Sequence, residues 1–324
     1  MAAAGAPAQR RPVSAGTLTG TDAAPAPPVD ASHIAALTEI NLADLLDSTG
    51  LARLQATPLR HLLRPAARRF ARTAAEFDAR VGLHGLTPGS AWLVRQMTAG
   101  LQVRGQQHVP AQGPLVVLSN HPGMTDTVAL FSALASRPDL RVMALDRPFL
   151  RALPQVARQL IFLPEDAAGL AAALRAAARH LKDGGALLTF PAGGIEPDPA
   201  AFGTARAIAS LRQWTDSYAL FARLAPRTLF VPALVSGVIS ADAQRHPLSR
   251  LRRTPREREK MAAALQIMFA RYRRLQAQVR FGLPLAASAQ DARGLCNGIA
   301  VQMREMVLAA GSRAPVPGDL LSNR

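Results

Sequence analysis

Residues 114–131 read Pro114-Leu115-Val116-Val117-Leu118-Ser119-Asn120-His121-Pro122-Gly123-Met124-Thr125-Asp126-Thr127-Val128-Ala129-Leu130-Phe131, two apolar runs separated by a polar segment. The first run is typical of a strand, and the second of a helix that follows it. Pro122-Gly123 predicts a turn, because this pair cannot continue a strand or comfortably start a helix. The segment therefore predicts a strand, a turn and a helix, with a histidine at the mouth of the strand.

The turn is expected to bring a base and an acid together. His121 and Asp126 are five residues apart, so a continuous helix would point them to different faces, whereas a tight turn lets Asp126 accept from one imidazole nitrogen. The other nitrogen is then left basic and facing solvent, as a general base requires. Thr125 is expected to be the helix N-cap. The alternative is a surface histidine without function, because short motifs have many false positives.

Outside this segment the chain is predicted to be α/β. Short apolar runs predict strands at Leu101–Arg104, Leu115–Ser119, Arg141–Leu145, Ala186–Phe190, Thr228–Leu234 and Gln278–Phe281. Helical patterns lie between them at Asp126–Ser136, Phe149–Leu160, Asp166–Asp183, Ala205–Leu224 and Arg256–Leu275. This alternation favours a largely parallel sheet flanked by helices, in which ligands gather beyond the carboxyl ends of the strands.

Four parts are predicted along the chain. Residues 1–30 are rich in Ala, Pro and Gly and predict a disordered tail, with a transit peptide as the alternative. Residues 31–100 predict a small N-terminal helical region. The α/β domain is assigned to residues 101–285, and a C-terminal helix and tail to residues 286–324.

Composition narrows the partners and the chemistry. The net charge of +16 suits an anionic membrane surface or nucleic acid, but with only 5% aromatic residues the stacking platforms of single-strand binders are sparse, and no nucleic-acid partner is expected. Cys296 is the only cysteine, which excludes an internal disulfide and a CxxC site. The histidines are scattered, so no metal site is predicted. No apolar stretch approaches the 20 or so residues of a transmembrane helix.

Two later segments also leave predicted strands through proline and glycine. Residues 190–199 read Phe190-Pro191-Ala192-Gly193-Gly194-Ile195-Glu196-Pro197-Asp198-Pro199, an open backbone that could donate N–H groups to an oxyanion or phosphate. The alternative is an ordinary strand-to-helix connection. Residues 231–237 combine a strand with Pro232 and a small-residue turn, which is a weak signal alone.

In this order, the three segments resemble the glycerophospholipid acyltransferase family, whose fold is PlsC-like (glycerol-3-phosphate acyltransferase-like). Residues 120–126 are similar to its H-x4-D block, Phe190-Pro191-Ala192-Gly193 to its F-P-E-G block, and Val231-Pro232 to its proline block. The resemblance implies transfer of an acyl group from acyl-CoA or acyl-carrier protein to a hydroxyl of a lysophospholipid-like or other lipid acceptor, without a cofactor. It also implies His121 as the general base and Asp126 as its orienting partner. Substrate contacts are predicted at Asn120, Pro122, Gly123, Thr125, Arg147, Phe190, Pro191, Gly193, Gly194 and Pro232.

Departures from the family pattern put the acceptor in doubt. The glutamate of F-P-E-G is Ala192 here, and the arginine that usually follows is missing. Residues 160–166 offer acids where the family commonly has an arginine. Losing two arginines removes bidentate phosphate contacts, so an acceptor phosphate is absent or held elsewhere, with Arg147 and Arg158 as substitutes. The alternative function is a catalytically altered member that binds lipid or acyl-CoA without turnover.

A basic segment predicts the second partner. Ten basic residues lie between Arg245 and Arg274, against only Glu257 and Glu259. Such a segment, interspersed with leucines, can sit on anionic headgroups, where each cation adds on the order of 1 kcal/mol. The alternatives are a solvated helix face, or contacts with acyl-CoA phosphates or an acidic carrier protein. A cytoplasmic, peripherally membrane-associated protein is therefore expected.

Overall fold

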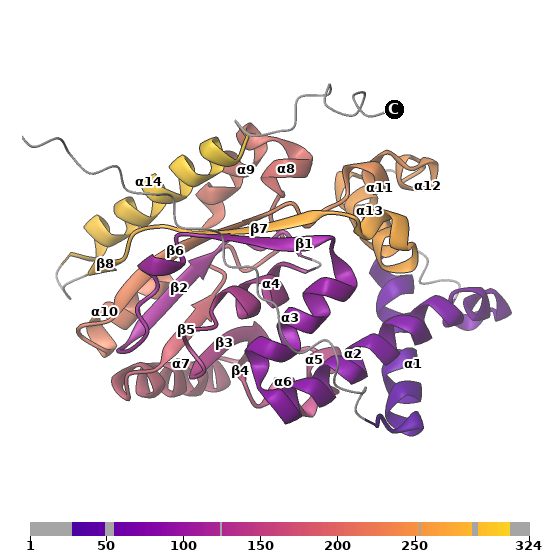
Figure 1. Ribbon diagram of the computed structural model, residues 1–324, viewed down its shortest axis with the longest axis horizontal. Helices are drawn as coiled ribbons and strands as arrows, with labels where there is room; N and C mark the ends of the chain where they lie inside the picture. Colours follow the sequence, from indigo (N-terminus) through magenta and orange to yellow (C-terminus); the bar gives the residue numbers. More distant parts are fainter. Residues whose placement is uncertain (1–27, 49–54, 124, 253, 287–290, 312–324) are drawn as a thin grey trace, which may run out of the picture.

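The computed structural model describes residues 28–48, 55–123, 125–252, 254–286 and 291–311. A central eight-stranded sheet runs through it (Figure 1). Its strands are β1 (Gly100–Arg104), β2 (Leu115–Ser119), β3 (Leu140–Leu145), β4 (Leu160–Leu163), β5 (Ala186–Thr189), β6 (Leu229–Ser236), β7 (Gln276–Phe281) and β8 (Leu285–Ala286). Their spatial order is β1-β7-β6-β2-β5-β3-β4, with β8 paired to β6.

The sheet is mostly parallel, and β2 lies at its centre. Both neighbours of β2, strands β5 and β6, run parallel to it, whereas β7 and β8 pair with β6 antiparallel. Leu115, Val116, Val117 and Leu118 have no exposed surface, because both faces of β2 are covered. The predicted fold class, a largely parallel sheet flanked by helices and preceded by a helical region, is confirmed.

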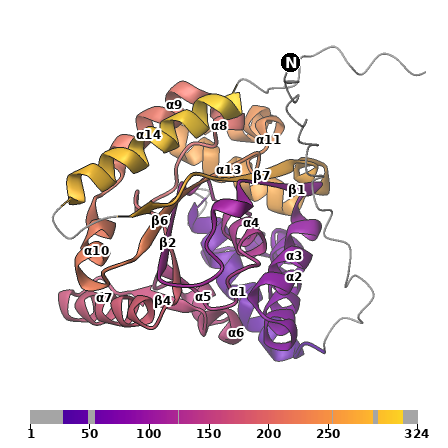
Figure 2. The same ribbon diagram turned by 60° about the vertical axis from the view of Figure 1, so that its left-hand side comes forward.

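Helices form a layer on each face of the sheet (Figure 2). The helices of the first layer are α1 (Ala31–Ser48), α2 (Arg64–His84), α3 (Leu86–Met97), α4 (Asp126–Ala133), α5 (Pro148–Arg151) and α6 (Pro154–Ala157). The second layer has α7 (Ala167–Lys182), α8 (Pro199–Phe202), α9 (Thr204–Ser210), α10 (Leu220–Leu224) and α14 (Ala292–Gly311). Leu115 and Val117 pack in one core with Phe77 of α2, while Val116 and Leu118 pack in the other with Met303 of α14. Alternate side chains of one strand thus serve two cores.

Between β6 and β7 the chain forms a separate helical insertion. It consists of α11 (Ala241–Arg245), α12 (Pro247–Arg250), α13 (Pro255–Met268) and the 3-10 turn η6 (Ala270–Arg273). The insertion has a small core of its own around Leu265 and Tyr272. Its α13 contacts α1 and α2, so it lies beside the first helical layer.

Three predicted helices are wrong in part. The predicted helix 149–160 is two short helices, α5 and α6, and its last residue begins β4, which was not expected. Pro154 starts α6, and Leu160–Leu163 is drawn into the sheet by pairing with β3. The predicted helix 205–224 is broken after α9, where Thr215 donates its N–H to the Pro191 carbonyl 3.0 Å away. The predicted helix 256–275 ends at Met268.

The described residues leave some predictions untested. The predicted tail, residues 1–30, lies outside the described part except for residues 28–30, and residues 312–324 lie outside it as well. The domain boundaries stay a prediction. Within the described ranges, no helix is both long enough and apolar enough to span a membrane.

Candidate active site

The site is built where β2 ends and the chain turns into α4. Asn120, the first residue after β2, is buried, and its side-chain amide donates to the Val235 carbonyl at 2.9 Å and accepts from the Val235 N–H at 2.7 Å. These two bonds continue the pairing of β2 with β6 beyond the last ladder position. The start of the turn is therefore fixed to a neighbouring strand.

His121 and Asp126 meet within the turn. The His121 Nδ1 lies 2.7 Å from Asp126 Oδ2, as the sequence predicted. Asp126 is almost wholly buried and also accepts from the Gly123 N–H at 2.8 Å, the Thr127 N–H at 2.5 Å and the Thr127 hydroxyl at 3.0 Å. Four donors hold the carboxylate, so the imidazole orientation is fixed and Nε2 is left for a reacting group.

Electrostatics favour the charged form of both groups. Burial alone would lower the pKa of His121, but the charge and hydrogen bond of Asp126 and the charge of Glu196 outweigh it, so that pKa is raised. Burial would raise the pKa of Asp126, but the charge and hydrogen bond of His121, with the donors from Gly123 and Thr127, lower it. Asp126 is thus an ionised partner that strengthens the basicity of the imidazole.

An apolar cavity of about 610 Å³ opens at His121. It lies between α2 and α3 on one side and β3, β4 and α4–α6 on the other, and its wall includes Phe70, Phe77, Leu93, Met97, Phe131 and Leu153. The Phe190 ring packs against the imidazole, with the ring centroids 4.5 Å apart. A hydrocarbon chain fits such a cavity, because it has few polar groups to desolvate.

A match to a known protein family identifies the class of this domain. Residues 100–236 match the model of the family described as Acyltransferase. This part of the chain is an acyltransferase-family domain. The family predicted from the sequence is confirmed, and the match includes both His121 and Asp126.

The chain is also similar to a solved structure. This is the 1-acyl-sn-glycerophosphate (LPA) acyltransferase PlsC from Thermotoga maritima, with 15% identity and a TM-score of 0.43 over 88% of this chain and 97% of that chain. No curated protein gives a significant match. The assignment to the acyltransferase family rests on the family match.

The acyltransferase domain brings half of the predicted substrate contacts to the cavity. The wall of the cavity includes Thr125, Arg147, Phe190, Gly193 and Gly194. It does not include Asn120, Pro122, Gly123, Pro191 or Pro232. Asn120 serves the link to β6. Gly123 serves the turn, since its φ of +88° favours glycine. Pro232 is buried on β6 against Gly282, where an added Cβ would lie 2.7 Å from the proline ring.

Two local expectations for the domain need correction. Thr125 occupies the N-cap position of α4 but makes no capping bond, and its buried hydroxyl has no hydrogen-bond partner within the described residues. In the first turn the Thr127 N–H donates instead to Asp126 Oδ1, and the Asp126 N–H donates to the Gly123 carbonyl at 3.3 Å. The Gly193 N–H, expected to face an oxyanion, donates to the Phe190 carbonyl at 3.0 Å, whereas the Gly194 N–H makes no hydrogen bond within the described ranges.

Sequence reasoning missed two buried carboxylates that shape the acyltransferase site. Glu196 accepts from the His121 N–H, and Asp198, with no exposed surface, accepts from four backbone N–H groups. The only sequence signal was their place in a proline-bounded loop, Glu196-Pro197-Asp198-Pro199. Acids in a segment that prolines make rigid indicate a structural role.

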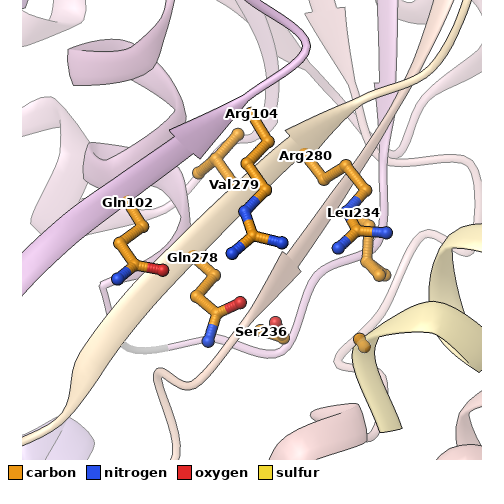
Figure 3. A pocket seen from close by; sticks show the side chains of 8 residues that line it. Gln102, Arg104, Leu234, Ser236, Gln278, Val279 and Arg280 are labelled. Atoms are coloured by element: carbon orange, nitrogen blue, oxygen red, sulfur yellow. The ribbon is translucent and has the colours of Figure 1, made fainter. Parts of the chain in front are cut away.

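A second, much smaller pocket lies away from the dyad. Figure 3 shows Arg104 and Arg280 side by side on β1 and β7, where they are paired in register. Gln102 and Gln278, two residues earlier on the same strands, form another such pair. The pocket has a volume of about 10 Å³ and shares no residue with the apolar cavity. In the part of the chain that the structure describes, no group of three or more His, Cys, Asp or Glu residues is placed to hold a metal ion.

Proposed function

We propose that the protein is an O-acyltransferase that moves a fatty acyl group from acyl-CoA or acyl-carrier protein to a hydroxyl of a lysophospholipid-like or other lipid acceptor. One observation carries this proposal: an imidazole held at Nδ1 by a buried carboxylate opens onto an apolar cavity of about 610 Å³. The cavity supplies room for a hydrocarbon chain, and the free Nε2 supplies a base at its mouth.

The reaction follows from the free imidazole nitrogen. His121 Nε2 removes the proton of the acceptor hydroxyl as its oxygen attacks the thioester carbonyl carbon. A C–O bond forms and the C–S bond breaks, and the leaving thiolate takes the proton from the imidazolium. Asp126 keeps the tautomer and stabilises the imidazolium while it exists. The Gly194 N–H, which has no partner among the described residues, is the candidate donor to the oxyanion.

The acceptor contact is proposed at Arg147. This residue is exposed at the cavity, and its guanidinium makes no hydrogen bond or ion pair within the described residues. Arg158, the other substitute, donates to Gln155 Oε1 at 2.9 Å and does not line the cavity. A free guanidinium beside an acyl site fits an anionic headgroup.

An acceptor panel tests the reaction and this contact together. Free-thiol release from acyl-CoA and acyl-carrier protein is measured with lysophospholipids of different headgroups and with acylated amino acids. Wild type is expected to consume a thioester only with a lipid hydroxyl acceptor. Arg147→Gln is expected to raise KM about tenfold for an anionic acceptor with little change in kcat, because a charge-assisted contact made equally in the ground and transition states is lost.

The alternative is a family member that binds lipid or acyl-CoA without turnover. Ala192 and the missing arginines favour it, since they depart from the family pattern. Saturable binding of a non-hydrolysable acyl-CoA analogue, with no thiol released for any acceptor, would establish this alternative and remove the enzyme proposal.

Membrane contact is proposed through the α11–α13 insertion. Leu248, Leu251 and Phe269 are 47%, 77% and 45% exposed there. The same segment between β6 and β7 carries exposed basic side chains: Arg245, Arg250, Arg258, Lys260, Arg271 and Arg274. Apolar tips among cations match the acyl boundary and the anionic headgroups of a bilayer surface, respectively.

Vesicle sedimentation tests this surface. Wild type is expected to bind phosphatidylcholine vesicles more tightly when they also contain phosphatidylglycerol, and less tightly as salt is raised. The double variant Leu248→Glu/Leu251→Glu should weaken binding more than about tenfold, because it removes two apolar side chains that would insert into the bilayer and adds charge repulsion. Val301→Glu, on an exposed position of α14, is the matched control. Equal loss in the control would place the membrane surface elsewhere.

A further inference from the structure

We infer that Glu196 is a positioning residue of the dyad, which fixes the main chain of His121 and places a second negative charge beside its imidazole. This inference rests on the proposed function for its catalytic meaning. Its geometry does not depend on that function, because the contacts belong to the folded chain.

The two residues are joined in both directions. The His121 N–H donates to Glu196 Oε2 at 3.0 Å, and the Glu196 N–H donates to the His121 carbonyl at 2.8 Å. Both backbone groups of the histidine are therefore held by one residue that lies 75 positions along the chain. Asp126 thus holds the ring of His121 at Nδ1, and Glu196 holds its main chain.

Glu196 is a buried acid in the loop that follows β5. Only 3% of its surface is exposed, although it lies in a loop. The loop thus holds a carboxylate against the turn that carries the dyad.

Hydrogen bonds to Glu196 favour its ionised form, whereas its burial disfavours that form. Its Oε1 accepts from Trp214 Nε1 at 2.8 Å and lies 3.2 Å from the Ser210 hydroxyl, while Oε2 faces the His121 N–H. Burial raises the pKa of Glu196 above its ordinary value, and these hydrogen bonds offset the rise only in part. Each oxygen meets an N–H donor, which is the arrangement that favours the negative form.

A second charge matters most when the imidazole is protonated. During hydroxyl attack His121 becomes an imidazolium, and its positive charge then lies near both Asp126 and Glu196. The charge of Glu196 acts with that of Asp126 to raise the pKa of His121 against burial. A neutral residue at position 196 should therefore leave a weaker base in an unchanged pocket.

The test separates charge from hydrogen bonding. In Glu196→Gln, the amide oxygen can accept from only one of the two N–H groups, that of His121 or that of Trp214. The amide nitrogen then faces the other N–H, so two donors oppose each other. The double variant Glu196→Gln/Trp214→Phe removes that conflict: the amide oxygen accepts from His121, and the amide nitrogen can donate to Ser210 Oγ. Trp214→Phe alone keeps the charge, and Glu165→Gln, at an exposed position, is a matched control.

The first readout is the His121 pKa, measured by NMR titration of labelled histidine, with the signal assigned from its loss in His121→Ala. We expect this pKa to fall in Glu196→Gln and in the double variant, but not in Trp214→Phe or Glu165→Gln. The second readout is the pH profile of kcat/KM, whose acid limb should move to lower pH by the same amount. At the plateau, the weaker base should lower kcat/KM about 3- to 10-fold.

The outcomes are distinct. If the double variant folds and keeps the His121 pKa of Trp214→Phe, the charge of Glu196 does not act on the imidazole and the inference is wrong. If the pKa falls as expected but no variant, wild type included, consumes thioester, the inference about Glu196 holds and the proposed function fails.

Discussion

Replacing His121 by alanine is expected to lower kcat/KM for thioester consumption about 10²- to 10⁴-fold, because the acceptor hydroxyl loses the general base that we propose. The fold should survive the change. The imidazole is 29% exposed, and Asp126 keeps three other donors after the ring is removed. His84→Ala is the control, since His84 is exposed and its ring has no partner within the described residues. Full activity of folded His121→Ala would remove the base from the mechanism.

The wild-type enzyme should show the same base in its pH dependence. His121 must be neutral to accept a proton, so activity should fall as the pH drops through its pKa. Because Asp126 and Glu196 raise that pKa against the effect of burial, the fall should begin at a higher pH than for an ordinary histidine. The pH profile of kcat/KM measures this fall. The residual activity of His121→Ala should not show it.

Replacing Asp198 by alanine is expected to lower the free energy of unfolding by about 3–5 kcal/mol. The carboxylate accepts from the N–H groups of Ala200, Gly237, Val238 and Ile239 at 2.8–3.0 Å, and it has no exposed surface. Alanine leaves these four N–H groups, one of them buried and three partly buried, without their acceptor. Urea denaturation followed by circular dichroism measures the loss.

The matched control for this loss is Asp242→Ala. Asp242 is paired with Arg245, but its side chain is 75% exposed, so the change should stay within about 0.5 kcal/mol of wild type. Asp198→Asn should fall between the two, because an amide keeps one acceptor oxygen and brings in a donor that faces other donors. If Asp198→Ala unfolds with a free energy within about 1 kcal/mol of that of wild type, the four hydrogen bonds to Asp198 do not stabilise the fold as we expect.

Local sequence was enough to predict the dyad and its strand. Leu115–Ser119 is an apolar run of strand length, and Pro122-Gly123 ends it within the next few residues. His121 and Asp126 lie in one turn, so their meeting depends only on local backbone. The family resemblance also rests on short blocks of this kind, and the family match confirms it.

Features that depend on distant partners were out of reach. Leu160–Leu163 is a strand only because β3 offers it an edge, while its own sequence fits the end of a helix equally well. Glu196 and Asp198 accept from groups up to 75 and 41 residues away, and no spacing within one segment reports such contacts. The residue type of Thr125 predicts a cap for α4, but Thr125 makes no capping bond and the Thr127 N–H donates to Asp126 instead.

The link between Asn120 and Val235 has a consequence for the order of assembly. The amide that holds the start of the turn finds its partner 115 residues later in the chain. Closing so long a loop is slow and entropically costly, and it cannot occur on the ribosome before β6 has left the exit tunnel. Until then β2 has an apolar edge without its neighbour, so newly made chains pass through a stage that is exposed to aggregation, in which the start of the turn is not yet tied to β6.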